Sequence, residues 1–360
     1  MAKSLVQSAK APPDKPKQSK QYDLFTSFFG DSKNLSNTIE LWDAIPKYAV
    51  SARIQSGLRD EKGNLPVHEQ EFKYRPTAPG LPSEINCKVT IQPASIKSAD
   101  GTYKQFYPSA DEEIIEEVLK KLFTDQQFGI HSPEKAESWV KFSLYMIQKE
   151  LKVRGKTRSI DEIKTSLEIL SRAVYDVEFE GSSKKLIYTN PILNDMIRTQ
   201  RSDYLQDPKS LWTARLPALI SKSVNELTYR QFNYGTLMSL TLPLARWFHK
   251  RLSHQYTQAS VMHPYHIKFT SICRDSGLLN HSRRSVNIAT VESALEELKS
   301  AQVLFRYEKE ERRRGRKIED IKYTMHPSMD FVQEMKAANA RQTKSREQTE
   351  LSSRQTNLLR

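Results

Sequence analysis

One order of elements occurs twice in this chain of 360 residues, and it constrains the fold more than any other feature of the sequence. In the first copy, Cys87, Val89 and Ile91 alternate in a strand predicted at 86–91, and hydrophobic periodicity predicts a helix at about 110–123 and a short helix at 144–151. A longer helix from Ile160 opens with a capping box of Ser159 and Glu162. Apolar and acidic residues then alternate from Tyr175 to Phe179, which indicates a half-buried strand, and residues 186–189 form the returning strand.

The second copy repeats this order. It opens with a strand predicted at 211–216 and a helix near 217–227. Helices are also predicted at 243–254 and 270–276, and a long helix begins near Ser282. Strands follow at 303–307 and 321–325, joined by a long basic turn. A helix, a short helix, a turn, a longer helix and a two-stranded ribbon are the parts of a winged helix. We therefore predict an α+β fold with two tandem winged-helix domains, although other α+β domains can also contain helices followed by a hairpin.

The helix predicted at 110–123 begins with a capping box, because Ser109 and Glu112 have the required spacing. Its apolar residues form one stripe, and two carboxylate pairs lie opposite that stripe. Lysines four residues after the second pair favour an interpretation as solvated ion pairs. These residues are Glu112–Glu113, Glu116–Glu117 and Lys120–Lys121.

Composition divides the chain into five segments. Residues 1–20 are rich in Lys, Pro, Gln and Ser and are predicted to be a disordered basic arm. Residues 21–83 are expected to be an irregular lead-in, followed by winged-helix domains at 84–200 and 201–338. Residues 339–360 are expected to be a loose polar tail.

The net charge of +13 is concentrated in three short segments. Residues 1–20, 309–317 and 339–360 carry +4, +4 and +3, so the remaining 309 residues carry only +2. This concentration favours contacts with a polyanion over a uniformly basic surface.

Neither a membrane span nor a disulfide scaffold is expected. The apolar runs are far shorter than the roughly 18 residues that a span needs, and residues 1–20 hold no apolar stretch of a signal peptide. The two cysteines, Cys87 and Cys273, fit a reducing compartment and exclude a four-thiolate metal site. We expect a soluble cytoplasmic protein that does not bind membranes.

The start of the long helix in the second copy holds candidate base-reading residues. With Ile288, Val291 and Leu295 buried, the polar residues at its start fall on or near the exposed face. Arg suits guanine and Asn suits adenine in the major groove. The alternative is a solvated helix start capped by Ser282. The candidate DNA-binding residues are Arg283, Arg284, Asn287 and Thr290 on the helix and Arg312, Arg313, Arg314, Arg316 and Lys317 in the basic turn.

The basic turn in the second copy is expected to contact phosphates or the minor groove rather than to read bases in the major groove. A merely solvated, charged hairpin is the alternative. In the first copy the candidate DNA-binding residues are Arg154, Lys156, Arg158 and Lys164, and the turn at 182–185 is shorter and less basic. We therefore expect the second domain to supply more of the affinity and base reading, and the first domain more of the positioning.

The sequence gives little support for an enzymatic function. The sequence lacks a GxxxxGK[ST] phosphate-binding loop. His263, His266 and Cys273 are the nearest approach to a metal site, but loop and core roles are expected for them. We expect no catalytic residue, no metal and no cofactor.

The order of elements resembles plasmid replication initiators with tandem winged helices, in particular the TrfA-type initiators. The resemblance covers roughly residues 21–335 and is carried by DEEIIEEVLKKL, SLTLPLARWFHKRL and VESALEELKSAQVLF. It implies sequence-specific binding to direct repeats (iterons) in double-stranded origin DNA, origin opening, and recruitment of host DnaA, the replicative helicase and the sliding clamp. It also implies that a homodimer can form. A winged-helix transcriptional regulator that binds an operator is the alternative, and a nicking enzyme is a third.

A short segment near the N-terminus, QYDLF, resembles the pentapeptide that binds the bacterial sliding clamp. In that resemblance Leu24 and Phe25 would enter an apolar pocket and Gln21 would form a hydrogen bond at its rim. Tyr22 stands where Leu is usual, and short pentapeptides also match by chance.

Overall fold

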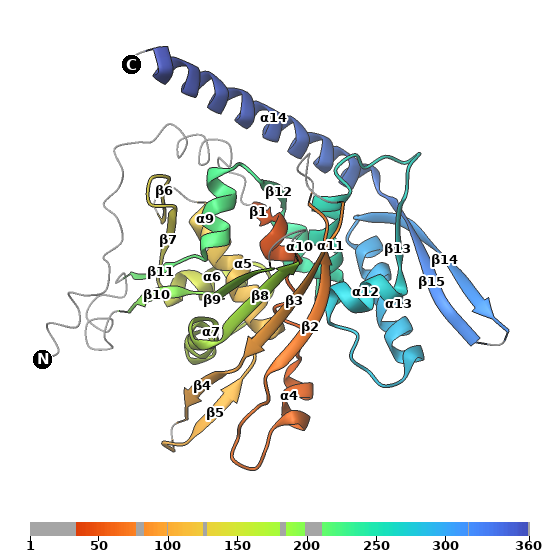
Figure 1. Cartoon of the computed structure of the whole chain (residues 1–360), viewed down its shortest axis with the longest axis horizontal. Helices are drawn as coiled ribbons and strands as arrows, with labels where there is room; N and C mark the ends of the chain where they lie inside the picture. The colour runs from red at the N-terminus through yellow and green to blue at the C-terminus, as the bar shows by residue number, and fades with distance from the viewer. Residues whose placement is uncertain are drawn as a thin grey trace, which may run out of the picture.

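The computed structural model describes residues 34–76, 83–98, 100–124, 128–180, 185–198, 211–315 and 317–358. Within these ranges two hydrophobic clusters define a first and a second lobe (Figure 1). The core of the first lobe runs from Ile39 to Met238, and that of the second lobe from Leu240 to Met335.

A four-stranded antiparallel sheet is the base of the first lobe. In order across the sheet, its strands are β2 (His68–Tyr74), β3 (Ile85–Gln92), β8 (Val174–Glu180) and β9 (Lys185–Pro191). Cys87, Val89 and Ile91 are buried along one face of β3, as the alternation of apolar residues predicted.

Three helices precede β8 in the predicted order. They are α5 (Ala110–Phe123), α6 (Leu144–Val153) and α7 (Ile160–Arg172). The predicted capping boxes are confirmed, and at the start of α7 the Ser159 N–H donates to Glu162 Oε2 at 2.6 Å. Each box satisfies backbone N–H groups that the first turn of a helix leaves without partners.

The carboxylate pairs of α5 are buried, which corrects the prediction of solvated ion pairs. Glu113, Glu116 and Glu117 are 5%, 2% and 0% exposed, and Lys120 is 3% exposed. The apolar stripe faces one side, but α3 (Glu40–Ala44) and α11 (Pro243–Gln255) cover the other side, where Asp43 of α3 pairs with Lys120 and Lys250 of α11 pairs with Glu113. Periodicity along one helix cannot show that a second, charged face is also covered.

Residues 34–76 form regular elements, whereas the sequence predicted an irregular lead-in over 21–83. Strand β1 (Leu35–Ile39) pairs antiparallel with β12 (Tyr229–Asn233), about 190 residues later in the chain, and helix α4 (Ala52–Leu58) precedes β2. Trp42 and Phe72 are 1% exposed in the core of the first lobe. Strands β1 and β12 are short and pair across a long stretch of sequence, so the local signal for them is weak.

The smaller strands of the first lobe form two groups. One is a hairpin of β4 (Ala94–Lys97) and β5 (Tyr103–Phe106). The other is a sheet of β10 (Asn194–Ile197), β11 (Trp212–Arg215), β7 (Glu137–Phe142) and β6 (Gly129–Ser132), in that order.

The two cores divide between Met238 and Leu240, not at the predicted boundary of 200/201. Strand β11 and helices α9 (Ala218–Asn225) and α10 (Tyr234–Ser239) belong to the first lobe. The sequence identified the strand and helix at 211–227 correctly, but β11 pairs with β7 of the first lobe. Only the pairing partner decides to which lobe a short strand belongs.

The second lobe contains the second copy of the repeated order. After α11 come β13 (Tyr265–Lys268), α12 (Phe269–Ser276), α13 (Arg284–Ser300), β14 (Leu304–Arg314) and β15 (Lys317–Pro327). The strands form an antiparallel sheet in the order β13-β15-β14. Helix α12 ends at Gly277 in the left-handed conformation, with a φ of 64°.

Helix α14 (Met329–Leu358) replaces the loose tail that was predicted for 339–360. Phe331 and Met335 anchor its start at 1% exposure in the core of the second lobe, and the helix then extends away from the body (Figure 1). Beyond Ala338 the sequence is polar all round, so it carries no apolar stripe that would predict a helix. Among the described residues, no helix combines the length and the apolar character that crossing a membrane requires.

Candidate nucleic-acid interface

Helix α13 presents a ridge of small side chains to the outside. Val291, Leu295 and Leu298 are buried on its inner side. On the opposite side Ser285, Ala289 and Ser293 are exposed at intervals of four residues. We call these three residues the small-residue ridge. A ridge without long side chains allows the helix backbone to approach another surface closely. It was not predicted, because none of its residues is basic or carries an amide.

Arg283 and Arg284 directly precede this ridge, and both are exposed, as predicted for the start of this helix. Arg284 is also held in place, since its Nη2 donates to the Glu319 carbonyl at 2.9 Å and its guanidinium lies 5.2 Å from the ring centre of Phe269. Helix α13 begins at Arg284 with Arg283 as its N-cap, so the predicted cap at Ser282 is replaced.

Asn287 and Thr290 use their polar groups inside the protein. Asn287 Oδ1 accepts from the His281 N–H at 3.1 Å, and its Nδ2 donates to the His281 carbonyl at 2.9 Å. Thr290 Oγ1 donates to the Val286 carbonyl one turn earlier, at 2.9 Å. Asn287 therefore stabilises the loop before α13 in this conformation. Of the four predicted residues at this helix start, Arg283 and Arg284 are the exposed ones that can contact a ligand.

The ribbon of β14 and β15 extends away from the second lobe and turns at Gly315 (Figure 1). At its tip Arg312 is 78% exposed and pairs with Glu319 at 3.2 Å, and Arg313 is 55% exposed and pairs with Glu311 at 2.5 Å. Arg314 and Lys317 are exposed. We call Arg312, Arg313, Arg314 and Lys317 the ribbon tip; the predicted Arg316 lies outside the described residues.

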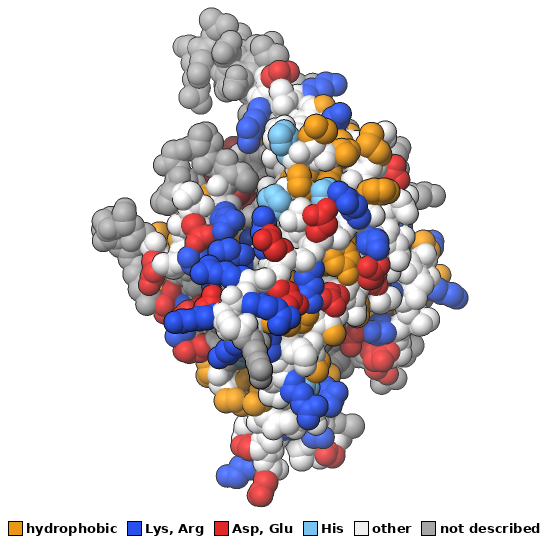
Figure 2. Space-filling view, turned by 90° about the vertical axis from the view of Figure 1, so that its right-hand side faces the viewer, with side chains coloured by type: hydrophobic (Ala, Val, Ile, Leu, Met, Phe, Trp, Pro, Cys, Tyr) orange, Lys and Arg blue, Asp and Glu red, His pale blue; other side chains and the backbone are white. Residues whose placement is uncertain are grey.

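The ribbon is tied to the two helices near its middle and close to its tip. Lys309 pairs with Glu292 of α13 at 2.9 Å, and Asp320 accepts from the Thr270 hydroxyl of α12 at 2.8 Å. On this side of the molecule Lys and Arg side chains gather between scattered acidic ones (Figure 2). The ribbon tip and the small-residue ridge therefore belong to one fixed surface.

Two of the DNA-binding residues predicted in the first lobe instead make contacts within the protein. Arg154 pairs with Glu150 at 3.1 Å and donates to Asn34 Oδ1 at 2.9 Å. Lys156 donates to the Leu240 carbonyl at 3.2 Å, and burial lowers its pKa. Both side chains join segments of the protein that are distant in sequence.

Arg158 and Lys164 remain partly exposed but pair with Asp111 and Asp161, respectively. The exposed residues at the start of α7 include Asp161 and Glu162, which do not favour a polyanion. Helix α6 is more basic on its outer side, where Lys149, Lys152, Tyr145 and Val153 are exposed. These residues were not predicted, because the predicted candidates of the first copy lie in the turn before α7 and in α7 itself.

Other sequence candidates lie elsewhere. Gln21, Leu24 and Phe25 lie outside the described residues, as does most of the turn at 182–185. His266 Nδ1 lies 3.0 Å from Thr324 Oγ1, and burial raises the pKa of Cys273 to about 11. In the described part of the chain, no group of three or more His, Cys, Asp or Glu side chains is arranged to hold a metal ion.

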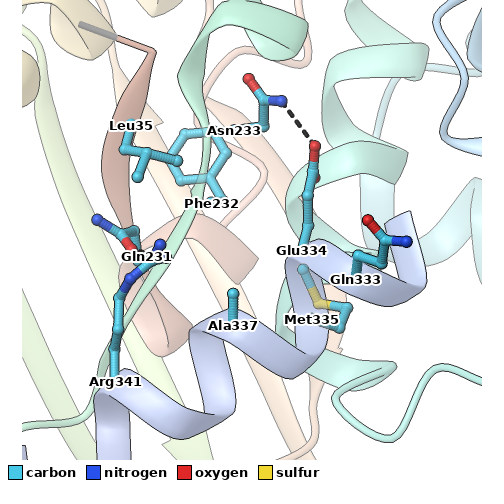
Figure 3. Close-up of a pocket in the computed structure, with 9 residues that line it drawn as sticks. All are labelled: Leu35, Gln231, Phe232, Asn233, Gln333, Glu334, Met335, Ala337 and Arg341. Atoms are coloured by element: carbon cyan, nitrogen blue, oxygen red, sulfur yellow. Dashed lines mark hydrogen bonds between the residues drawn. The ribbon is translucent and has the colours of Figure 1, made fainter. Parts of the chain in front are cut away.

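A cavity of about 250 Å³ lies between β1, β12 and α14 (Figure 3). Leu35, Phe232 and Met335 supply its apolar surface. At its rim Asn233 Nδ2 donates to Glu334 Oε1 at 2.7 Å, and burial raises the pKa of Glu334. The nine lining residues are Leu35, Gln231, Phe232, Asn233, Gln333, Glu334, Met335, Ala337 and Arg341.

The solved structures that match this chain include two of RctB and one of the Pi initiator protein, all at low similarity. Domains 2 and 3 of RctB match with a TM-score of 0.42 and 9% identity, covering 72% of this chain and 91% of that chain. A second structure of RctB domains 2–3 matches with a TM-score of 0.40 and 9% identity, covering 78% and 97%. The Pi initiator protein in complex with iteron DNA matches with a TM-score of 0.36 and 10% identity, covering 61% and 91%.

No protein-family model matches the chain, and neither does any curated protein. Because the similarity to solved structures is low, the interface rests on the residues of this chain.

Proposed function

We propose that this chain is a non-catalytic plasmid replication initiator that binds direct repeats in double-stranded origin DNA, with one winged helix in each lobe. The observation that carries the proposal is the combined surface of the second lobe. There the small-residue ridge of α13 begins with two exposed arginines and stands beside a basic ribbon.

The dimensions of DNA suit this surface. The major groove is about 12 Å wide and admits an α-helix. Ser285, Ala289 and Ser293 let α13 enter deeply, because none of them carries a long side chain. Alanine can contact the methyl group of thymine, and serine can bond to several base edges. Arg283 and Arg284 then reach guanine or phosphate oxygens near the helix N-terminus.

The ribbon tip adds affinity beside the start of the helix. Arg312 pairs with Glu319, and the Glu319 carbonyl accepts from Arg284. From this position the ribbon tip contacts the DNA backbone or the adjacent minor groove. Opening of the origin and recruitment of DnaA, the replicative helicase and the clamp belong to the same proposal. For the clamp, the sequence QYDLF is the supporting feature.

A footprint of the full-length protein on its neighbouring replicon DNA tests the proposal. Regularly spaced protection over direct repeats is the expected result. Protection of a single palindrome would instead favour a transcriptional regulator, and uniform weak protection would refute sequence-specific binding. An Arg283→Ala/Arg284→Ala variant should lose the protection pattern, whereas Arg154→Ala should keep it because that side chain faces Glu150 and Asn34.

A further inference from the structure

Eight charged side chains form a buried network where the two lobes meet. Helix α5 carries Glu113, Glu116, Glu117 and Lys120, and Asp43 and Lys47 come from α3 and the loop after it. Helix α11 of the second lobe adds Arg246 and Lys250. None of the eight is more than 9% exposed, and the four acidic side chains balance the four basic ones.

Glu113 and Glu117 join the lobes directly. Arg246 Nη2 and Lys250 Nζ each lie 2.8 Å from a Glu113 oxygen, and Lys250 Nζ also lies 3.3 Å from Glu117 Oε1. Burial by itself would raise the pKa of Glu113, but Arg246 and Lys250 lower it to about 2. Glu113 is therefore ionised at neutral pH and holds both cations of α11.

The remaining pairs of the network lie within the first lobe. Lys120 Nζ lies 2.8 Å from Glu117 and 2.9 Å from Asp43, and Lys47 Nζ lies 3.7 Å from Glu116. A buried charge that loses its partner is strongly unfavourable, whereas apolar side chains can slide past one another at little cost. A rotation of one lobe against the other would separate Glu113 from Arg246 and Lys250.

The loop before α13 also rests on the first lobe. A Cβ atom at Gly277 would lie 2.8 Å from the Cβ of Ala49, so the two backbones approach closely. Asn280 Nδ2 donates to the Ala49 carbonyl at 3.0 Å, and Gln70 Nε2 donates to the Arg274 carbonyl at 2.9 Å. The orientation of α13 is therefore set by contacts with the first lobe as well as by its own domain.

We propose that Glu113 and Arg246 are positioning residues that fix the angle between the lobes, and that the protein thereby selects the spacing between two DNA segments, one contacted by each lobe. This inference rests on the proposed function, because it requires both lobes to touch DNA. On the first lobe, the exposed Lys149 and Lys152 of α6 provide the contact.

The test uses the full-length protein and duplexes that carry the footprinted site with 0 to 10 base pairs inserted between its two protected segments. B-DNA turns once in about 10–10.5 base pairs, so an insertion of about five places the second segment on the opposite face of the duplex. Rigid linkage of two contacts raises affinity by about 10²–10⁴-fold. For the wild type we expect a loss of about 100-fold at an insertion of five and partial recovery at ten.

The variant Glu113→Gln/Arg246→Gln removes one acidic and one basic residue across the junction, while Lys250 keeps Glu117 as its partner. The matched control is Lys47→Gln/Glu116→Gln, which removes one buried pair within the first lobe and, like the junction variant, changes one glutamate of α5. Neither change touches the proposed DNA contacts. The junction variant should lose less than about 10-fold at an insertion of five, because rotation of a flexible junction follows the DNA. The control should keep the wild-type profile.

An unchanged profile for the junction variant overturns the proposal, and so does an equal flattening in the control. If the junction variant does not fold, Arg246→Lys takes its place. This substitution keeps the charge but loses the paired guanidinium contacts across the junction, in which Nε at 2.9 Å and Nη2 at 2.8 Å both bind Glu113 Oε2. A wild-type spacing profile for Arg246→Lys overturns the inference in that case. A wild type that binds its site without any spacing preference refutes the inference alone, whereas a wild type without sequence-specific binding refutes the proposed function.

Discussion

Neutralising the ribbon tip should reduce the salt dependence of DNA binding by an amount that the structure sets. Arg312, Arg313, Arg314 and Lys317 are exposed, and two of them pair with glutamates. Exposed ion pairs contribute less than about 1 kcal/mol, so a phosphate can replace the glutamate. Each phosphate contact contributes about −0.9 to the slope of log K against log salt concentration. Changing all four residues to Gln should therefore reduce the magnitude of the slope by about 3 to 4.

The assay measures the affinity for the footprinted duplex between 50 and 200 mM KCl. Over that range, four phosphate contacts account for a roughly 100-fold loss of affinity in the wild type that the variant lacks. Changing only Arg314 and Lys317 to Gln should reduce the slope by about 2. If the fourfold variant also changes the slope by only about 2, Arg312 and Arg313 stay paired with Glu319 and Glu311 in the DNA complex and do not contact phosphates.

A matched control neutralises four other exposed basic residues around α4, β4 and β5, away from the ribbon. These are Arg53, Lys62, Lys97 and Lys104. The control should leave the slope within experimental error of the wild type. A slope that is unchanged in the ribbon variant, or reduced equally in the control, would refute the assignment of the ribbon tip to phosphate contacts.

Four further predictions concern stability, measured by urea denaturation. Gly277→Ala should lower the free energy of unfolding by more than about 1 kcal/mol, because φ is 64° and the new Cβ would contact the first lobe; Gly155→Ala, with a φ of 71° and open space, should cost less. Glu113→Gln should reduce the loss of unfolding free energy between pH 4.5 and pH 2 by about 3 kcal/mol. The ion pairs of Glu113 hold its pKa at about 2 instead of 4.5, so they stabilise the protein above pH 4.5, and this stabilisation is lost as the pH falls. His249→Phe should remove about 2 kcal/mol of the loss between pH 7 and pH 5, because burial lowers the pKa of His249 to about 3 and only the unfolded state takes up a proton in that range. Phe331→Ala should cost about 3–5 kcal/mol through the cavity it leaves at the start of α14, and a cost below 1 kcal/mol would contradict the anchoring role of that residue.

Local sequence signals predicted those helices whose ends are fixed by residues next to them in the chain. The capping boxes at Ser109 and Ser159 and the Gly277 helix end are satisfied by neighbouring residues, so they can be recognised without the fold. The first lobe was harder to delimit, because β1 pairs with β12 and the division of the cores after Met238 depends on contacts between distant segments.

The candidate interface likewise combines residues that local sequence signals predicted with residues that only the structure reveals. Arg283 and Arg284 were predicted from the charge at a helix start, and the structure exposes both. The ridge of Ser285, Ala289 and Ser293 carries no chemical signal in the sequence and becomes visible only when the inner face of α13 is known.

By itself, the sequence determined the repeated order of helices and strands and the concentration of charge in a few segments, because periodicity, capping and composition are local properties. Only the tertiary structure decided what each charge does. The glutamates of α5 and the basic residues of α11 pair inside the protein, whereas the arginines of the ribbon tip stay exposed. The physical reason is that burial depends on what covers a side chain, and the glutamates of α5 are covered in part by α11, more than 100 residues away in the chain.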